Sequence, residues 1–176
     1  GLARRARRIR AGRGGPRLGP PALGDLYALA GDDARAEEQY ALVERIGTLA
    51  RAGGGIYDRQ LILFAADHNR GVDLAVSAAA ASLERRKDVY GYDAQAWALY
   101  KNGRLEEAKA ASRQALSQRT PDAKIWYHAG LIDQALGDED AARTELQRAL
   151  TISPAFDPLQ APKARAALTA LGVTAP

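Results

Sequence analysis

The side chains that most often catalyse reactions are scarce in this sequence and do not stand in catalytic spacings. There are two histidines, His68 and His128, and neither has a serine or cysteine nucleophile at a fixed motif distance. Cysteine is absent, which excludes thiolate catalysis and cysteine-bound zinc. No H-E-x-x-H motif, P-loop, or G-x-G-x-x-G motif between a strand and a helix occurs. We therefore expect no catalytic activity, no cofactor and no metal site.

Other groups that resemble catalytic or phosphate-binding elements have structural explanations. The acidic runs at 106–107 and 138–140 open predicted helices, where carboxylates favour the positive end of the helix dipole. The glycines at 53–55 follow a predicted helix and are typical of a flexible turn rather than of a phosphate cradle. His68 lies in a polar turn at 67–69, where a solvated histidine is ordinary. We interpret these residues as parts of the fold rather than of a site.

The basic residues are unevenly distributed along the chain. Seven of the 25 Lys and Arg residues fall within 1–17, a stretch without acidic residues, so acids outnumber bases in the rest. This start has two interpretations: a basic arm that binds nucleic acid or anionic lipid, or the remnant of an upstream unit. The stretch has no aromatic side chain to stack on bases, which favours the remnant and makes nucleic-acid binding the weaker expectation.

The sequence predicts no transmembrane segment, because no run of 18 apolar residues occurs. The arginine-rich start also lacks the apolar region of a signal peptide. The chain begins with glycine and has no methionine, so we expect a fragment or a processed form, and a signal upstream of it stays open.

The elements expected to position the remaining residues are helices. Hydrophobic residues make up 47% of the chain, and Ala and Leu dominate over β-branched and aromatic residues, as is typical of helices. A 34-residue interval separates Gly103 from Gly137 and Ala108 from Ala142. Apolar residues recur at spacings of three and four within the intervals, which predicts pairs of amphipathic helices. A single pair cannot bury its apolar stripe, so stacked pairs must share a core.

These 34-residue units resemble the tetratricopeptide repeat. The unit at 123–156 carries Trp126, Ala142 and Pro154 at positions of the repeat pattern. Further units that follow the pattern lie at 17–50, at 89–122 and, more loosely, at 55–88. The resemblance implies an all-α fold: a right-handed α-α superhelical solenoid of about four helix pairs plus a C-terminal capping helix. It also indicates a bacterial type and the C-terminal fragment of a longer array. A plain helical bundle with coincidental spacing is the alternative.

The expected domain organisation is a basic tail at 1–16, the solenoid at 17–172 and a terminal tail at 173–176. Its repeat units are expected at about 17–54, 55–88, 89–122 and 123–156, with the cap helix at 160–171. The individual helices are predicted at 21–30, 34–52, 56–67, 72–86, 89–101, 105–118, 123–136, 139–152 and 160–171.

The resemblance also implies where a partner binds. In tetratricopeptide proteins the first helix of each pair lines a concave groove and points side chains into it. The candidate binding residues at such positions are Arg59, Leu63, Tyr90, Trp97, Tyr100, Lys101, Lys124, Tyr127, His128 and Leu131. Aromatic side chains bury large areas at interfaces while keeping a polar handle. The alternative is that Trp97 and the tyrosines pack between repeats.

These inferences favour a non-enzymatic protein–protein interaction scaffold. The expected ligand is an extended or helical peptide or partner segment with apolar anchors and some acidic character. The clamp by which some family members hold a C-terminal carboxylate is not expected, because Leu63 and Ala94 occupy its asparagine positions. Two alternatives stay open: an adaptor for nucleic acid or anionic membranes through the N-terminal arginines, and a regulatory module of a larger enzyme complex.

Overall fold

Helices account for the regular structure of the protein. The computed structural model describes residues 19–53 and 58–173, and within these ranges it contains nine helices and no strand. The helices are α2 (Pro20–Leu29), α3 (Asp33–Ala52), α4 (Arg59–Asp67), α5 (Val72–Arg85), α6 (Val89–Lys101), α7 (Leu105–Ala115), α8 (Ala123–Leu136), α9 (Glu139–Ile152) and α10 (Gln160–Ala170). The predicted all-α fold class is confirmed.

The predicted helix boundaries agree with the observed ones to within three residues. The helix expected over 56–67 begins at Arg59, and the one expected over 105–118 ends at Ala115. The basic tail expected at 1–16 and most of the terminal tail expected at 173–176 lie outside the described residues.

The chain divides into two compact units, Gly1–Ile56 and Tyr57–Pro176. In the first unit, α2 and α3 pack against each other. Gly24 permits this approach, since a Cβ there would lie 2.5 Å from Cε1 of Tyr40. The Tyr40 hydroxyl donates a hydrogen bond of 2.9 Å to Asp25 on α2. The first unit is therefore one helix pair joined by an aromatic and a polar contact.

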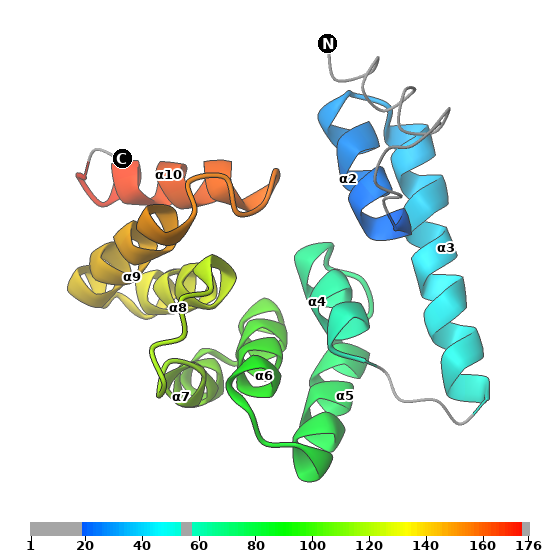
Figure 1. The fold of residues 1–176 in the computed structure, drawn as a ribbon, viewed down its shortest axis with the longest axis horizontal. Coiled ribbons are helices and arrows are strands. Elements are labelled where there is room, and N and C mark those ends of the chain that lie inside the picture. Colours follow the sequence, from blue (N-terminus) through cyan, green and yellow to red (C-terminus); the bar gives the residue numbers. More distant parts are fainter. Residues whose placement is uncertain (1–18, 54–57, 174–176) are drawn as a thin grey trace. The chain divides into compact units, whose positions relative to one another are not determined.

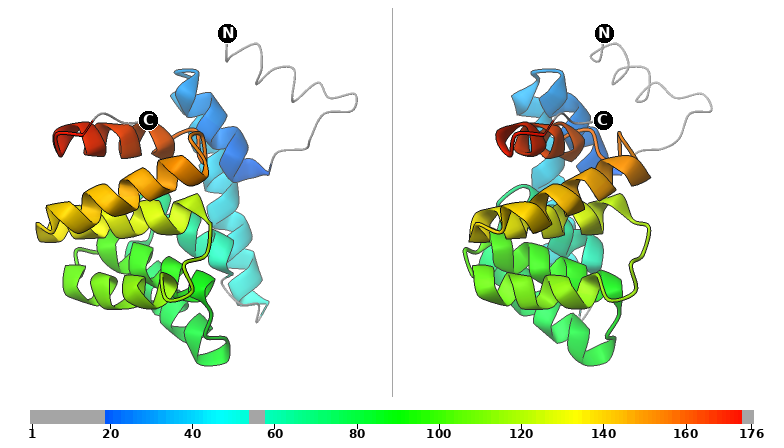
Figure 2. Two further views of the ribbon diagram at one scale, coloured as in Figure 1. Left: turned by 60° about the vertical axis from the view of Figure 1, so that its left-hand side comes forward. Right: turned by 90° about the vertical axis from the view of Figure 1, so that its left-hand side faces the viewer.

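In the second unit the helices form three pairs, α4 with α5, α6 with α7 and α8 with α9, and α10 packs on α9 (Figure 1). The second helix of a pair also contacts the first helix of the next, as α5 does with α6 and α7 with α8. The first helices contact one another in the order α4, α6, α8, so they form an inner layer. Figure 2 shows successive pairs as stacked layers with α10 on the last of them. This is the arrangement of a helical solenoid.

The helix ends follow from the local sequence. Asp58, Asp88 and Asp138 each accept a hydrogen bond from the backbone N–H three residues further on. Asp122 accepts one from the second residue after it. These side chains satisfy N–H groups that lack a partner at the starts of α4, α6, α9 and α8. Gly137 ends α8 at φ 82°, a left-handed conformation that glycine adopts without steric cost.

A close approach between α8 and α9 depends on Gly130. A Cβ at this position would lie 2.7 Å from Cγ and 3.2 Å from the backbone N of Leu146. We expect Gly130→Ala to lower the free energy of unfolding by about 1–3 kcal/mol, because the added methyl overpacks the helix pair. The higher helix propensity of alanine offsets part of this loss. Urea unfolding of the variant and the natural chain measures the difference.

A double-mutant cycle provides the control for Gly130→Ala. In a Leu146→Ala background the added methyl meets a smaller side chain, so the same substitution should cost less free energy than in the natural chain. An equal cost in the two backgrounds would contradict direct packing of residue 130 on residue 146.

Candidate partner-binding surface

Tyr90 lies in the first turn of α6 and borders two surface hollows of the second unit. Its side chain is among the large hydrophobic ones that remain exposed, at 37%. The larger hollow, of about 550 Å³, is lined by Tyr90, Thr120, Pro121, Asp122, Ala123, Lys124, Ile152, Ser153 and Phe156. The smaller, of about 300 Å³, is lined by Tyr90, Arg59, Ser82, Arg86, Asp88 and Gly91. Tyr90 and these two hollows together form a surface termed here the Tyr90 trough.

The trough is positioned by the starts of the inner helices. Arg59, Tyr90 and Lys124 lie in the first turns of α4, α6 and α8, which contact one another in that order. The Arg59 guanidinium lies over the Tyr90 ring, 4.8 Å from its centroid. Apolar surface comes from Ile152 at the end of α9 and from Phe156 in the turn after it. The trough therefore combines an exposed aromatic ring, further apolar side chains and cations.

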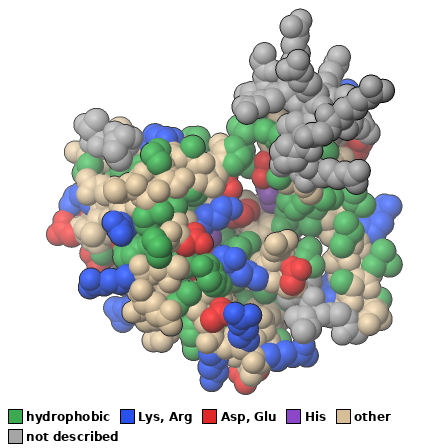
Figure 3. All heavy atoms as spheres, viewed as in Figure 1, with side chains coloured by type: hydrophobic (Ala, Val, Ile, Leu, Met, Phe, Trp, Pro, Cys, Tyr) green, Lys and Arg blue, Asp and Glu red, His purple; other side chains and the backbone are tan. Residues whose placement is uncertain are grey.

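The cations of the trough are paired with carboxylates of the same chain. Arg59 lies 3.6 Å from Asp93, and Lys124 lies 2.8 Å from Asp157. Hydrogen bonds and the charge of Lys124 lower the pKa of Asp157, although its burial acts in the opposite direction. On the face drawn in Figure 3, basic and acidic side chains of the second unit are interspersed rather than gathered in one patch. Charge alone therefore does not select a partner for this surface.

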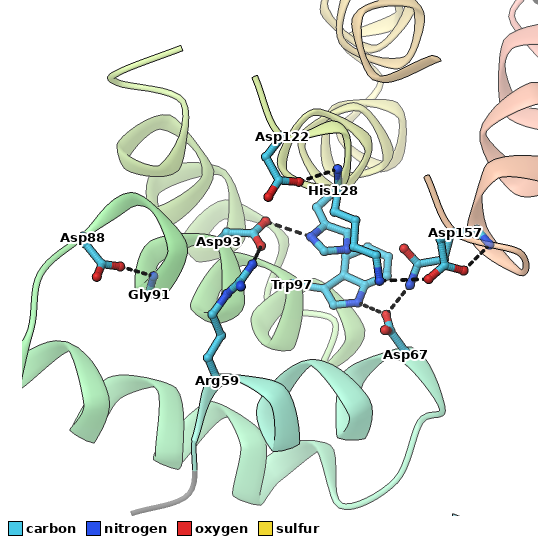
Figure 4. A network of polar contacts seen from close by, with 11 residues as sticks. Arg59, Asp67, Asp88, Gly91, Asp93, Trp97, Asp122, His128 and Asp157 are labelled. Carbon is cyan, nitrogen blue, oxygen red and sulfur yellow. Dashed lines mark hydrogen bonds and ion pairs between the residues drawn. The ribbon is translucent and has the colours of Figure 1, made fainter. Parts of the chain in front are cut away.

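Trp97, on α6, is a buried centre of the inner layer. Its side chain is 3% exposed, and its Nε1 donates a hydrogen bond of 2.7 Å to Asp67 on α4. The indole stacks with Tyr100 at a centroid distance of 5.0 Å and with His128 at 4.1 Å. Lys101 Nζ lies 5.4 Å from the indole centroid. Trp97 thus links α4, α6 and α8 through packing and a hydrogen bond (Figure 4).

His128 and Asp93 form a second buried link between inner helices. Their side chains are 2% and 1% exposed, and His128 Nδ1 lies 2.8 Å from Asp93 Oδ1. Figure 4 shows Arg59 reaching the same carboxylate from α4. Among the described residues, no hydrogen-bond partner reaches His128 Nε2. The arrangement joins α4, α6 and α8, and Asp93 supplies the negative charge that faces the guanidinium of Arg59.

The inner side of the second unit is occupied by its own side chains. Gln160, at the start of α10, donates a hydrogen bond of 2.5 Å to Asp67, at the end of α4. Tyr127 is 1% exposed and packs against Phe156 at a centroid distance of 5.3 Å. Burial, with a smaller contribution from Asp67, raises the pKa of Tyr127 above its usual value. The last helix thus contacts the first helix of this unit.

Tyr100 and Lys101 lie at the end of α6 and are partly withdrawn from water. Burial lowers the pKa of Lys101, and the nearby charge of Lys163 lowers it further. Burial raises the pKa of the Tyr100 hydroxyl. Both shifts follow from the partial burial of these side chains, because burial disfavours the charged form.

The ten residues expected to bind a partner therefore fall into three groups. Arg59, Tyr90 and Lys124 line the trough. Leu63, Tyr100, Lys101 and Leu131 are partly buried. Trp97, Tyr127 and His128 are buried. The burial of the third group agrees with the alternative that Trp97 packs between repeats, and direct binding by any of the ten stays a prediction.

The sequence reasoning did not select Phe156 or Asp157 for the site. Both lie in the turn between α9 and α10, outside the helices to which the resemblance assigns partner contacts. Asp157 accepts hydrogen bonds from the backbone N–H of Leu159 and Gln160. An aspartate just before a predicted helix is a signal for such a role at the helix start.

Comparison with protein families identifies two of the helix pairs. The family model described as "Tetratricopeptide repeat" matches residues 90–120 and 123–156, which contain α6 with α7 and α8 with α9. These two helix pairs are tetratricopeptide repeats, as the sequence pattern predicts. No curated protein matches the chain. Tetratricopeptide repeats generally mediate protein–protein interaction, and their proteins are typically non-enzymatic scaffolds.

Two further features of the described residues concern metal ions and membranes. No cluster of three or more His, Cys, Asp or Glu side chains within 19–53 and 58–173 is placed to hold a metal ion. Of the helices in these ranges, none has the length and apolar character needed to cross a bilayer. The arginine-rich stretch of the nucleic-acid alternative lies outside the described residues.

Proposed function

We propose that this protein is a non-enzymatic scaffold that binds a segment of a partner protein across the Tyr90 trough. The observation that carries the proposal is the exposure of the Tyr90 ring, at 37%, between two hollows at the starts of the inner helices. An exposed aromatic side chain next to an apolar hollow is the kind of residue that contributes most to interface affinity.

The proposed partner segment is extended or helical and carries a bulky apolar side chain. The larger hollow offers it Tyr90, Ile152 and Phe156 as apolar contacts. Thr120 and Ser153 line the same hollow and offer polar groups to the backbone of the segment. Acidic residues of the segment would meet Arg59 and Lys124. Because both cations already have carboxylate partners in the chain, we expect apolar contacts to supply most of the affinity.

Site-specific photo-cross-linking tests the proposal. A benzophenone amino acid replaces Tyr90 in one variant and Leu74 in another. Leu74 lies on α5 of the same unit and is matched in exposure, at 36% against 37%, but does not line the trough. We expect one discrete partner segment to be cross-linked at position 90 and not at position 74, with mass spectrometry identifying the segment.

Equal cross-linking of the same proteins from both positions would contradict the proposal, because it would indicate general surface contact. Cross-linking of nucleic acid in place of protein at position 90 would contradict the proposal as well.

A further inference from the structure

Three ionisable side chains from three consecutive helices meet on the second unit, away from the Tyr90 trough. Lys109 comes from α7, Asp133 from α8 and Glu145 from α9. The Asp133 side chain is 1% exposed and the Glu145 residue 8%, so both carboxyl groups are buried. Lys109 Nζ donates to Asp133 Oδ1. Lys109 belongs to the repeat matched at 90–120, and the two acids belong to the repeat matched at 123–156.

The two acids leave one oxygen each without a donor. Among the described residues, no N–H or O–H group of another residue donates a hydrogen bond to Asp133 Oδ2 or Glu145 Oε2. A buried carboxylate oxygen without a donor is costly, and two adjacent buried carboxylates do not both ionise readily. Burial and a hydrogen bond to Asp133 raise the pKa of Glu145 from 4.5 to about 8. Burial and the neighbouring Asp133 thus favour the protonated form of Glu145.

We propose that Asp133 and Glu145 share one proton and that this carboxyl pair is a proton-dependent contact that holds α9 against α8. With one proton present, the pair carries a single negative charge. Lys109 balances this charge and so links the pair to the preceding repeat. Loss of the proton leaves two buried negative charges beside one cation and removes the hydrogen bond between the acids.

The charges around Glu145 come from each element that packs on it. Lys109 on α7 favours its ionised form, whereas Asp133 on α8 and Asp138 before α9 oppose it. The helix α10 packs on α9 through apolar residues, as Leu146 and Leu150 lie in one core cluster with Leu168. Burial and the two aspartates therefore favour the protonated form of Glu145, and one lysine opposes it.

The direction in which the stability of the folded state changes with pH follows from the raised pKa of Glu145. The folded chain keeps the proton up to about pH 8, while the unfolded chain loses it near 4.5. The folded state binds the extra proton between these values, so its stability falls as the pH rises through this window and levels off above it. In Glu145→Gln the side-chain amide donates to Asp133 at every pH, so this fall should disappear.

The test measures urea unfolding of the natural chain and of Glu145→Gln from pH 5 to pH 9. Relative to the variant, the folding equilibrium constant of the natural chain should fall by up to about tenfold per pH unit until about pH 8. Glu106→Gln is the control, since Glu106 is an exposed acid in the first turn of α7. Glu106→Gln should show the same pH dependence of the free energy of unfolding as the natural chain. A Glu145→Gln profile parallel to the natural one would overturn the proposal.

A second measurement tests the proposal on the natural chain, so it does not require Glu145→Gln to fold. Carbon-13 NMR of the natural chain follows the carboxyl resonance of Glu145 through a pH titration. A midpoint near 8 supports the shared proton, and a midpoint near 4.5 overturns it.

Discussion

Replacing Trp97 by alanine is expected to lower the free energy of unfolding by about 3–5 kcal/mol. The indole is 3% exposed and belongs to a core cluster with Tyr127 and Leu146. Its removal leaves a cavity between α4, α6 and α8 and deletes both its stacking with His128 and its hydrogen bond to Asp67. Cavity formation and lost apolar burial dominate this cost, because each hydrogen bond contributes only about 1 kcal/mol.

Urea unfolding monitored by circular dichroism measures the loss in Trp97→Ala. Trp97→Phe is the control: it provides a smaller aromatic ring and loses the hydrogen bond to Asp67, so we expect a smaller loss of free energy than in Trp97→Ala. A loss below about 1 kcal/mol in Trp97→Ala, which is usual for surface substitutions, would contradict the burial of this side chain.

Tyr90→Ala is expected to weaken binding of the cross-linked partner segment at least tenfold. A well-packed aromatic anchor at an interface contributes about 2 kcal/mol or more, and 1.4 kcal/mol corresponds to a tenfold change in affinity. The free energy of unfolding should change by only about 1 kcal/mol, since the ring is 37% exposed and contacts the Arg59 guanidinium from one side. The dissociation constant of a synthetic peptide of that segment, measured by calorimetry, tests the expectation.

Leu74→Ala is the control for Tyr90→Ala, because it removes an apolar side chain of matched exposure outside the trough. Its affinity for the peptide should equal that of the natural chain. A stable Tyr90→Ala variant that binds the peptide with unchanged affinity would show that Tyr90 is not an anchor.

The contrast between Trp97 and Tyr90 shows which substitutions report on binding. The sequence pattern places both residues on the groove-lining side of one helix, α6. In the structure Trp97 is buried and Tyr90 is exposed. A loss of partner capture in Trp97→Ala or Tyr127→Ala would therefore be expected from unfolding alone, whereas Tyr90→Ala separates binding from stability.

Much of the fold was predictable because its signals are local. Apolar residues at helical spacing, capping aspartates such as Asp138 and turn glycines such as Gly137 all act within a few residues of their own position. The 34-residue interval adds the pairing of the helices. Even the departure at Asn69, which stands where the pattern has a turn glycine, is accommodated, because Asn69 adopts a left-handed conformation at φ 52°.

The arrangement of the site was less predictable because it depends on contacts between distant repeats. The hydrogen bond from Gln160 to Asp67 joins residues 93 positions apart, and no repeat interval reports it. This contact lies where α10 approaches the end of α4, beside the buried ring of Trp97. Burial of that ring therefore depends on the curvature of the stacked pairs, whereas a helix position alone specifies only which side of a helix a residue occupies.

The most direct test of the Tyr90 trough as the partner-binding surface is NMR of the folded chain with the cross-linked segment as a labelled peptide. Intermolecular nuclear Overhauser effects should connect an apolar side chain of the peptide with the rings of Tyr90 and Phe156, with Lys124 shifted as well. Effects confined to the outer side of α7 and α9, for example at Gln114 and Arg148, with Tyr90 unperturbed, would contradict the proposed surface.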